Sequence, residues 1–120
     1  MIKNTVAIAA ACLLGFAAPA FAGQQDFTLN NETGKGITHV YVSEATSQEW
    51  GDDVLGAEVA LEDGEASEIS FDGYEDDVCK FDVKITLEDC KSWTVSNIDL
   101  CTMHDLVFKM QGGKVVYAKK

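Results

Sequence analysis

Residues 78–87, Val-Cys-Lys-Phe-Asp-Val-Lys-Ile-Thr-Leu, alternate between apolar and polar side chains from Cys79 onward. A period of two residues is typical of a β-strand with one buried face. The odd-numbered side chains are predicted to face the core and the even-numbered ones, Asp82 among them, the solvent. A polar break at residues 88–91 follows, and residues 92–96 alternate again. The stretch therefore predicts a β-hairpin.

The same alternation recurs on both sides of this hairpin, and no window long enough for a helix has a 3.6-residue period. The further predicted strands are residues 26–30, 37–43, 57–61, 66–71, 105–110 and 114–118. Residues 62–65, with Asp63-Gly64 at the tip, have the signature of a hairpin turn between two of them. We expect an all-β domain over residues 23–120, a small antiparallel β-sandwich of about seven or eight strands.

The first 22 residues have the features of a secretory signal. Lys3 supplies a positive charge, residues 5–18 are apolar, and Ala20 and Ala22 are the small residues that a signal peptidase reads. We expect a signal-peptide helix that is cleaved before Gly23, and a mature protein that is periplasmic or secreted. After this segment no apolar run approaches the roughly 20 residues of a spanning helix, so no membrane contact is expected after cleavage.

A lipoprotein signal is the alternative for the N-terminal segment, with Cys12 as the lipidated residue. Ala9 stands where such a signal usually has Leu, and the apolar stretch before Cys12 is very short. We therefore favour the cleaved signal peptide.

The charge of the chain excludes some partners. Nine Lys, no Arg and 20 Asp+Glu give a formal net charge of −11. Nucleic-acid binding depends on clustered cations, so it is not expected, and an anionic bilayer would repel the chain for the same reason. The acidic segments instead favour a protein partner with a basic surface, because opposite charge speeds the encounter.

Three cysteines, Cys79, Cys90 and Cys101, remain after signal cleavage. Export places them in an oxidising compartment, where a disulfide is expected, and three pairings are open. Strand parity favours Cys79–Cys101, because Cys79 begins the core-facing set and Cys101 follows the apolar residues Ile98 and Leu100. Cys90 is then a free thiol in a turn, able to form a mixed disulfide or a covalent dimer. The spacing lacks the CxxC or His-rich pattern of a zinc site.

The chain carries no motif for nucleophilic catalysis, since no Gly-x-Ser-x-Gly elbow is present. His39 lies on the polar face of a predicted strand and His104 in a loop, so we interpret both as surface residues. Close carboxylate pairs arise by chance in a chain this acidic and carry little specificity. We expect no enzymatic activity.

Calcium is the stronger chemical candidate, because hard cations prefer carboxylate and carbonyl oxygens. Asp72, Asp76 and Asp77 form one candidate ligand set, and Asp52 with Asp53 a second. Neither segment has the EF-hand spacing. The alternative interpretation is a solvated charge run that keeps the protein soluble.

For the second segment a structural interpretation is also open. Trp50 and Leu55 would plug one end of the sandwich, while Asp53 caps amides of its own turn.

Several segments in order resemble the uncharacterised exported bacterial β-sandwich proteins, some of which are labelled argininosuccinate lyase. The similar segments are residues 27–34, 40–43, 50–56 and 61–64, then Ile69 and Phe71, then residues 79–84 and 97–101. The resemblance rests on the Trp-Gly-x-Asp-x-Leu pattern of residues 50–55 and on Cys79 and Cys101, and it supports their pairing. The lyase label does not fit a chain this short without basic residues arranged for the substrate. The resemblance implies a Gly-type turn residue at position 90, where this sequence has Cys, and it implies no activity.

These observations favour an exported, non-enzymatic module that binds a protein or another ligand and needs no cofactor. A Ca²⁺-binding module is the first alternative, and an enzyme with an unrecognised site is the second.

Overall fold

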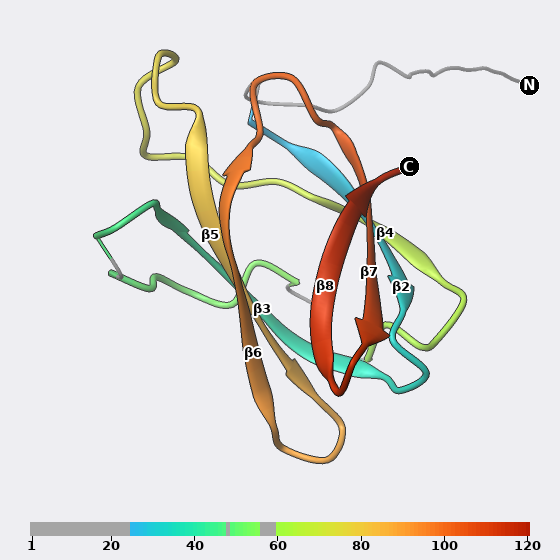
Figure 1. The fold of residues 1–120 in the computed structure, drawn as a ribbon. Helices are drawn as coiled ribbons and strands as arrows, with labels where there is room; N and C mark the ends of the chain where they lie inside the picture. Colours follow the sequence, from blue (N-terminus) through green and yellow to red (C-terminus); the bar gives the residue numbers. More distant parts are fainter. Residues whose placement is uncertain (1–24, 48, 56–59) are drawn as a thin grey trace, which may run out of the picture.

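A computed structural model describes residues 25–47, 49–55 and 60–120, all of them in strands, turns and loops. The signal-peptide prediction, residues 1–22, lies outside this part. The described residues form seven strands (Figure 1): β2 Phe27–Glu32, β3 Ile37–Glu44, β4 Ala66–Ile69, β5 Lys80–Leu87, β6 Ser92–Asp99, β7 Asp105–Gln111 and β8 Lys114–Lys119. No helix among these residues is long and apolar enough to cross a bilayer.

The strands build two sheets, in the orders β4-β2-β7-β8 and β3-β5-β6. The all-β prediction is confirmed, and the two sheets enclose the apolar core. The prediction of a wholly antiparallel arrangement is wrong for one pair, because β2 and β7 run parallel, with Leu29 opposite Leu106. Alternation of side chains reveals which face of a strand is buried but not the direction of its neighbour.

The odd-numbered residues of β5 lie in the core as their alternation predicts. Phe81, Val83 and Ile85 are fully buried, and Leu87 is 1% exposed. Phe27, Leu29 and Phe108 face them from the other sheet and are also fully buried. Each such side chain contributes about 1.5–3 kcal/mol by leaving water, so this layer accounts for much of the stability of the domain.

Strand β6 extends to Asp99, beyond the predicted end at residue 96. Phe81 pairs with Ile98 and Val83 with Val95, so two residues of β6 lie opposite Asp82. This is a β-bulge, and Asn97 takes a φ of 64° within it. The Asn97 N–H donates to Asp82 Oδ1 at 2.9 Å, and Asp82 is only 6% exposed. The expectation that Asp82 faces solvent is wrong, because its carboxylate accepts the backbone N–H that the bulge leaves without a partner in the ladder.

The turn at residues 62–65 forms, but it does not join a hairpin. Glu65 N–H donates to the Glu62 carbonyl at 3.0 Å, and Gly64 takes a φ of 89°, which favours glycine. Leu61 makes an isolated bridge to Ile37, whereas β4 pairs with β2 in the other sheet. The turn therefore carries the chain from one sheet to the other. Residues 57–59 of the predicted strand lie outside the described residues.

Candidate functional site

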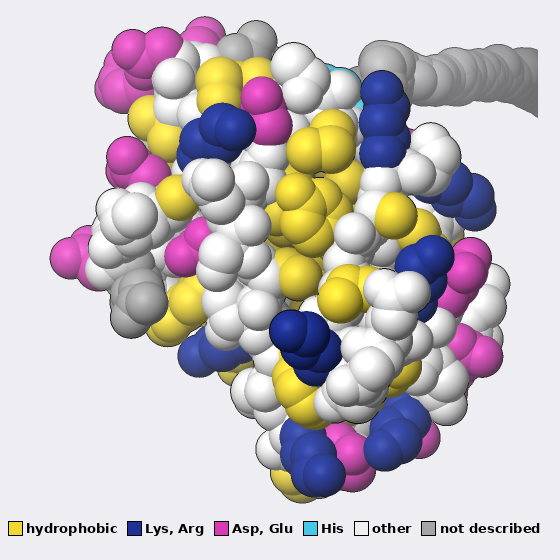
Figure 2. Space-filling model, in the orientation of Figure 1, with side chains coloured by type: hydrophobic (Ala, Val, Ile, Leu, Met, Phe, Trp, Pro, Cys, Tyr) yellow, Lys and Arg dark blue, Asp and Glu magenta, His cyan; other side chains and the backbone are white. Residues whose placement is uncertain are grey.

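Two ends of the sandwich differ in their connections. We call residues 49–55, 70–79 and 100–104 the loop end, and residues 33–36, 62–65 and 88–91 the turn end (Figure 1). Acidic side chains gather at the loop end, over the segment that precedes β5, at the upper left of Figure 2. The candidate residues of the sequence analysis, apart from Cys90, belong to this end.

Asp53 attaches the segment 49–55 to β3. Its Oδ1 accepts the N–H of Val40 and of Leu55, each at 3.0 Å, and its Oδ2 lies 2.7 Å from His39 Nδ1. The Val54 N–H also donates to the Val40 carbonyl at 2.8 Å. The prediction that Asp53 caps turn amides is confirmed, and the segment covers part of the free edge of β3.

The same contacts determine the charge state of Asp53. Partial burial raises the pKa of its carboxyl, but the hydrogen bonds from Val40 N–H, His39 and Leu55 N–H outweigh this effect, so the pKa lies below its ordinary value. The carboxylate is therefore held ionised by the bonds that attach the segment.

The prediction that Trp50 and Leu55 close one end of the sandwich is correct for Leu55 only. Leu55 packs against the core cluster as expected. Trp50 is not among the side chains that pack there, because its ring lies beneath the ammonium of Lys84, with Nζ 4.9 Å from the ring centroid. The same ammonium lies 5.1 Å from the Tyr41 ring centroid. Trp50 thus belongs to a cation–π contact on the outer face of the β3–β5 pair.

Gln25 and Asp26, which the sequence analysis did not identify, bind the acidic segment 70–79 through hydrogen bonds. Gln25 Nε2 donates to the Glu75 carbonyl at 2.9 Å and to the Val78 carbonyl at 3.3 Å. Asp26 Oδ1 accepts the Phe71 N–H at 3.3 Å. Gln25 is 4% exposed and Asp26 1% exposed, so these hydrogen bonds satisfy buried polar groups and attach the segment to the start of β2.

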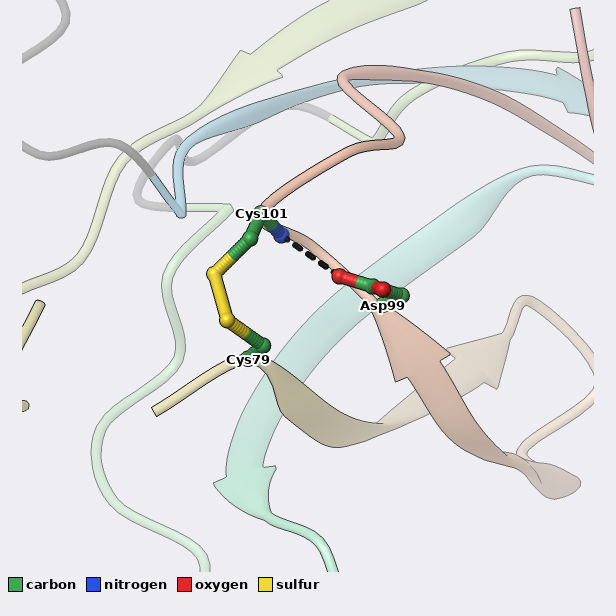
Figure 3. Close-up of side chains that lie close together, drawn as sticks. All are labelled: Cys79, Asp99 and Cys101. Atoms are coloured by element: carbon green, nitrogen blue, oxygen red, sulfur yellow. Dashed lines mark hydrogen bonds between the residues drawn. A yellow bond between two sulfur atoms is a disulfide. The ribbon is translucent and has the colours of Figure 1, made fainter. Parts of the chain in front are cut away.

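The disulfide Cys79–Cys101 closes the base of this segment, with a Cα–Cα distance of 5.1 Å (Figure 3). The Cys101 N–H donates to Asp99 Oδ1 at 3.1 Å, and the Leu100 N–H donates to the Cys79 carbonyl at 2.9 Å. The pairing predicted from strand parity is confirmed. Cys90 is a free, exposed cysteine at the turn end.

The two histidines make separate contacts. His39 is the partner of Asp53 described above, and its ring stacks on Tyr41 with centroids 6.1 Å apart. His104 Nδ1 lies 3.1 Å from the carbonyl oxygen of Asp26, so it helps to hold the start of β2. The structure brings neither histidine to the hollows described below.

The predicted calcium ligands do not converge. Within the described ranges, the one group of three metal-ligating side chains whose ligand atoms all lie within 4.8 Å of one another is Cys79, Asp99 and Cys101, and its sulfurs are bonded to each other. Asp72 lines one hollow at the loop end, whereas Asp76 and Asp77 line another. The calcium site stays a prediction from the sequence.

The first hollow lies between the segments 49–55 and 70–79 and measures about 430 Å³. Its lining residues are Val42, Gly51, Asp52, Val54, Ser70, Phe71, Asp72 and Tyr74. The ion pairs of the described residues are Lys35–Asp89 and His39–Asp53, so no cation of this part of the chain neutralises Asp52 or Asp72. The hollow combines apolar walls with two unneutralised carboxylates.

The second hollow, of about 380 Å³, adjoins the first through Tyr74 and is otherwise lined by Glu75, Asp76 and Asp77. The Tyr74 ring packs edge-to-face on Phe81 and Phe71, with centroids 5.1 Å and 5.8 Å apart. These contacts fix the wall that the two hollows share.

Comparisons with known proteins assign no family. No family model matches the chain, and no curated protein matches it. A solved structure with similarity to this chain is the NMR structure of the protein from Eubacterium rectale, which is 15% identical and covers 84% of this chain and 94% of its own, with a TM-score of 0.49.

Proposed function

We propose that the protein is an exported, non-enzymatic binding module that holds a protein partner or another ligand at its loop end. The observation that supports this function is the first hollow, where Asp52 and Asp72 lie beside apolar walls and have no cationic partner within the described ranges. Ligand sites are concave, largely apolar, and carry a few polar groups that orient the ligand. The hollow has this composition.

The walls of the hollow are fixed before any ligand arrives. Asp53 bonds one wall to β3, and Gln25 with the Cys79–Cys101 disulfide holds the other. A site built on fixed segments loses less entropy when it binds, which favours affinity. The disulfide also fits the proposed export, because such bonds persist in oxidising compartments.

A photo-crosslinker placed in the hollow tests this proposal. Ser70 lines the hollow and is exposed, whereas Ser96 is exposed on β6 and lies outside the hollow, so it is the matched control. We expect a p-benzoylphenylalanine at position 70 to yield a discrete adduct in cells that express the full chain. The adduct should disappear when Asp52 and Asp72 are both replaced by Asn.

Two results would contradict the proposal. An equal adduct from position 96 would show that capture is not specific to the hollow. The absence of an adduct at position 70 would show that nothing binds there.

A further inference from the structure

We infer that the first hollow receives the basic side chain of a peptide segment, a Lys or Arg, with its stem along the apolar walls and its cation between Asp52 and Asp72. This inference rests on the proposed function and names the chemistry of its ligand. Each half of the side chain has a matching part of the hollow.

The walls suit the apolar stem. Val42 is 5% exposed and forms part of the floor, while Val54, Phe71 and Tyr74 are partly buried and pack against the core. Lys and Arg side chains bury their methylene stems along apolar surfaces and keep the charged head at the rim. A short ammonium ion without a stem would leave these walls uncovered.

The rim suits the cation. Asp52 and Asp72 carry no cationic partner among the described residues, and a hydrogen bond between ionised groups is stronger than a neutral one. The formal net charge of −11 also draws a basic segment toward the molecule. Charge complementarity therefore selects a basic occupant over an apolar or acidic one.

The aromatic wall adds a further contact of a kind that this chain already makes. Lys84 Nζ lies 5.1 Å and 4.9 Å from the ring centroids of Tyr41 and Trp50. Tyr74 offers a ring at the boundary of the two hollows. An incoming cation near this ring would gain a comparable cation–π contact.

The second hollow continues the site beyond Tyr74. Glu75, Asp76 and Asp77 line it beside Tyr74. A basic residue that neighbours the first one in the peptide would come to lie among these carboxylates. We expect segments with two basic residues to bind more tightly than segments with one.

Matched peptides test the inference on protein purified after expression of the full chain. The probes are Gly/Ser peptides with one Lys, with norleucine in its place, or with two Lys, and free 1,5-diaminopentane. Norleucine keeps an apolar stem and removes the charge. Affinities come from calorimetry at low salt, and nitrogen–proton correlation spectra show which amides shift.

We expect the Lys peptide to shift the amides that line the hollow and the norleucine peptide to bind at least about 10-fold more weakly, the value of one charged hydrogen bond. Asp72→Asn should weaken the Lys peptide by about 10-fold and leave the norleucine peptide unchanged. Glu68→Gln is the matched control, because it removes one exposed carboxylate of β4 that does not line the hollow, and it should change neither affinity.

Four results would overturn the inference. Equal binding of Lys and norleucine peptides would show an apolar ligand, and equal binding of free diaminopentane would show a small amine instead of a peptide. Equal losses in Asp72→Asn and Glu68→Gln would show general charge attraction. Absence of binding by every probe would refute the ligand class, while a specific adduct at position 70 would still uphold the proposed function.

Discussion

Asn31, next to the turn end, and the carboxylates Asp52 and Asp72, at the loop end, are polar groups in opposite situations. Asn31 of β2 borders the turn end and is fully buried, and its Nδ2 donates to the carbonyls of Lys35 and Leu61, both at 2.8 Å. Its Oδ1 accepts the N–H and the hydroxyl of Thr33 at 2.9 Å and 2.7 Å. At the loop end, Asp52 and Asp72 line the first hollow, and neither forms an ion pair with another residue that the structure describes.

This difference separates groups that hold the fold from groups that are available to a ligand. Polar groups that satisfy each other contribute to stability and offer nothing to a partner. Exposed carboxylates that form no ion pair contribute little to the free energy of unfolding, so replacing Asp52 or Asp72 should hardly change it. The following variants test this division, beginning with the largest expected effect.

Asn31→Ala has the largest expected effect. It removes the four hydrogen bonds of a fully buried side chain and takes the acceptor from the Thr33 N–H, so we expect the free energy of unfolding to fall by about 3 kcal/mol in thermal or urea denaturation. Asp72→Asn, measured in parallel, should change it by less than about 0.5 kcal/mol. A similar loss in both variants would show that the two ends do not differ.

Asp53→Asn tests the intermediate case, a carboxylate of the loop end that does hold the fold. The folded-state pKa of Asp53 lies below its unfolded value of about 3.9. Its ionisation therefore stabilises the protein above that pH, and the contribution is lost as the pH falls through the folded pKa. We expect the variant to be about 1 kcal/mol less stable at neutral pH and to approach the parent protein in acid.

Urea denaturation of both proteins between neutral pH and strong acid measures this convergence. A constant difference in stability at every pH would show that the ionised form of Asp53 has no special role.

Cys90→Gly has the smallest expected effect. Cys90 N–H donates to the Leu87 carbonyl at 2.8 Å, and Cys90 takes a φ of 69°, a left-handed conformation that glycine adopts without steric cost. We expect this variant to gain about 0.5–1 kcal/mol of stability. Cys90→Ser, which keeps the Cβ and removes the thiol, should leave the stability unchanged, and an equal gain there would point to the thiol instead of the backbone.

Sequence patterns predicted the parts of this molecule that follow from a local period. Alternation in residues 78–87 placed Phe81, Val83 and Ile85 in the core, and the same parity selected Cys101 as the partner of Cys79. Turn chemistry located Cys90 in the β5–β6 turn, where it takes a positive φ.

Features that join distant segments carried no such signal. The alternation of β5 predicts a solvent-facing Asp82, because it contains no sign of the extra residue that β6 inserts opposite Asp82. Gln25 is an ordinary polar residue in the sequence, and its two bonds to carbonyls 50 and 53 residues away exist only after folding. The first hollow likewise unites Asp52 and Asp72 from two loops, and sequence spacing indicated only that each loop is acidic.

The parallel pairing of β2 with β7 has a consequence for the order of events during folding. Thr28 lies opposite Asp105 and Glu32 opposite Lys109, so β2 can pair with β4 early, but the complete sheet needs a strand from near the end of the chain. Contacts of such long range slow folding, because much chain must be ordered before they form. We therefore expect the β2–β7 pair to form late, after the local β5–β6 and β7–β8 hairpins.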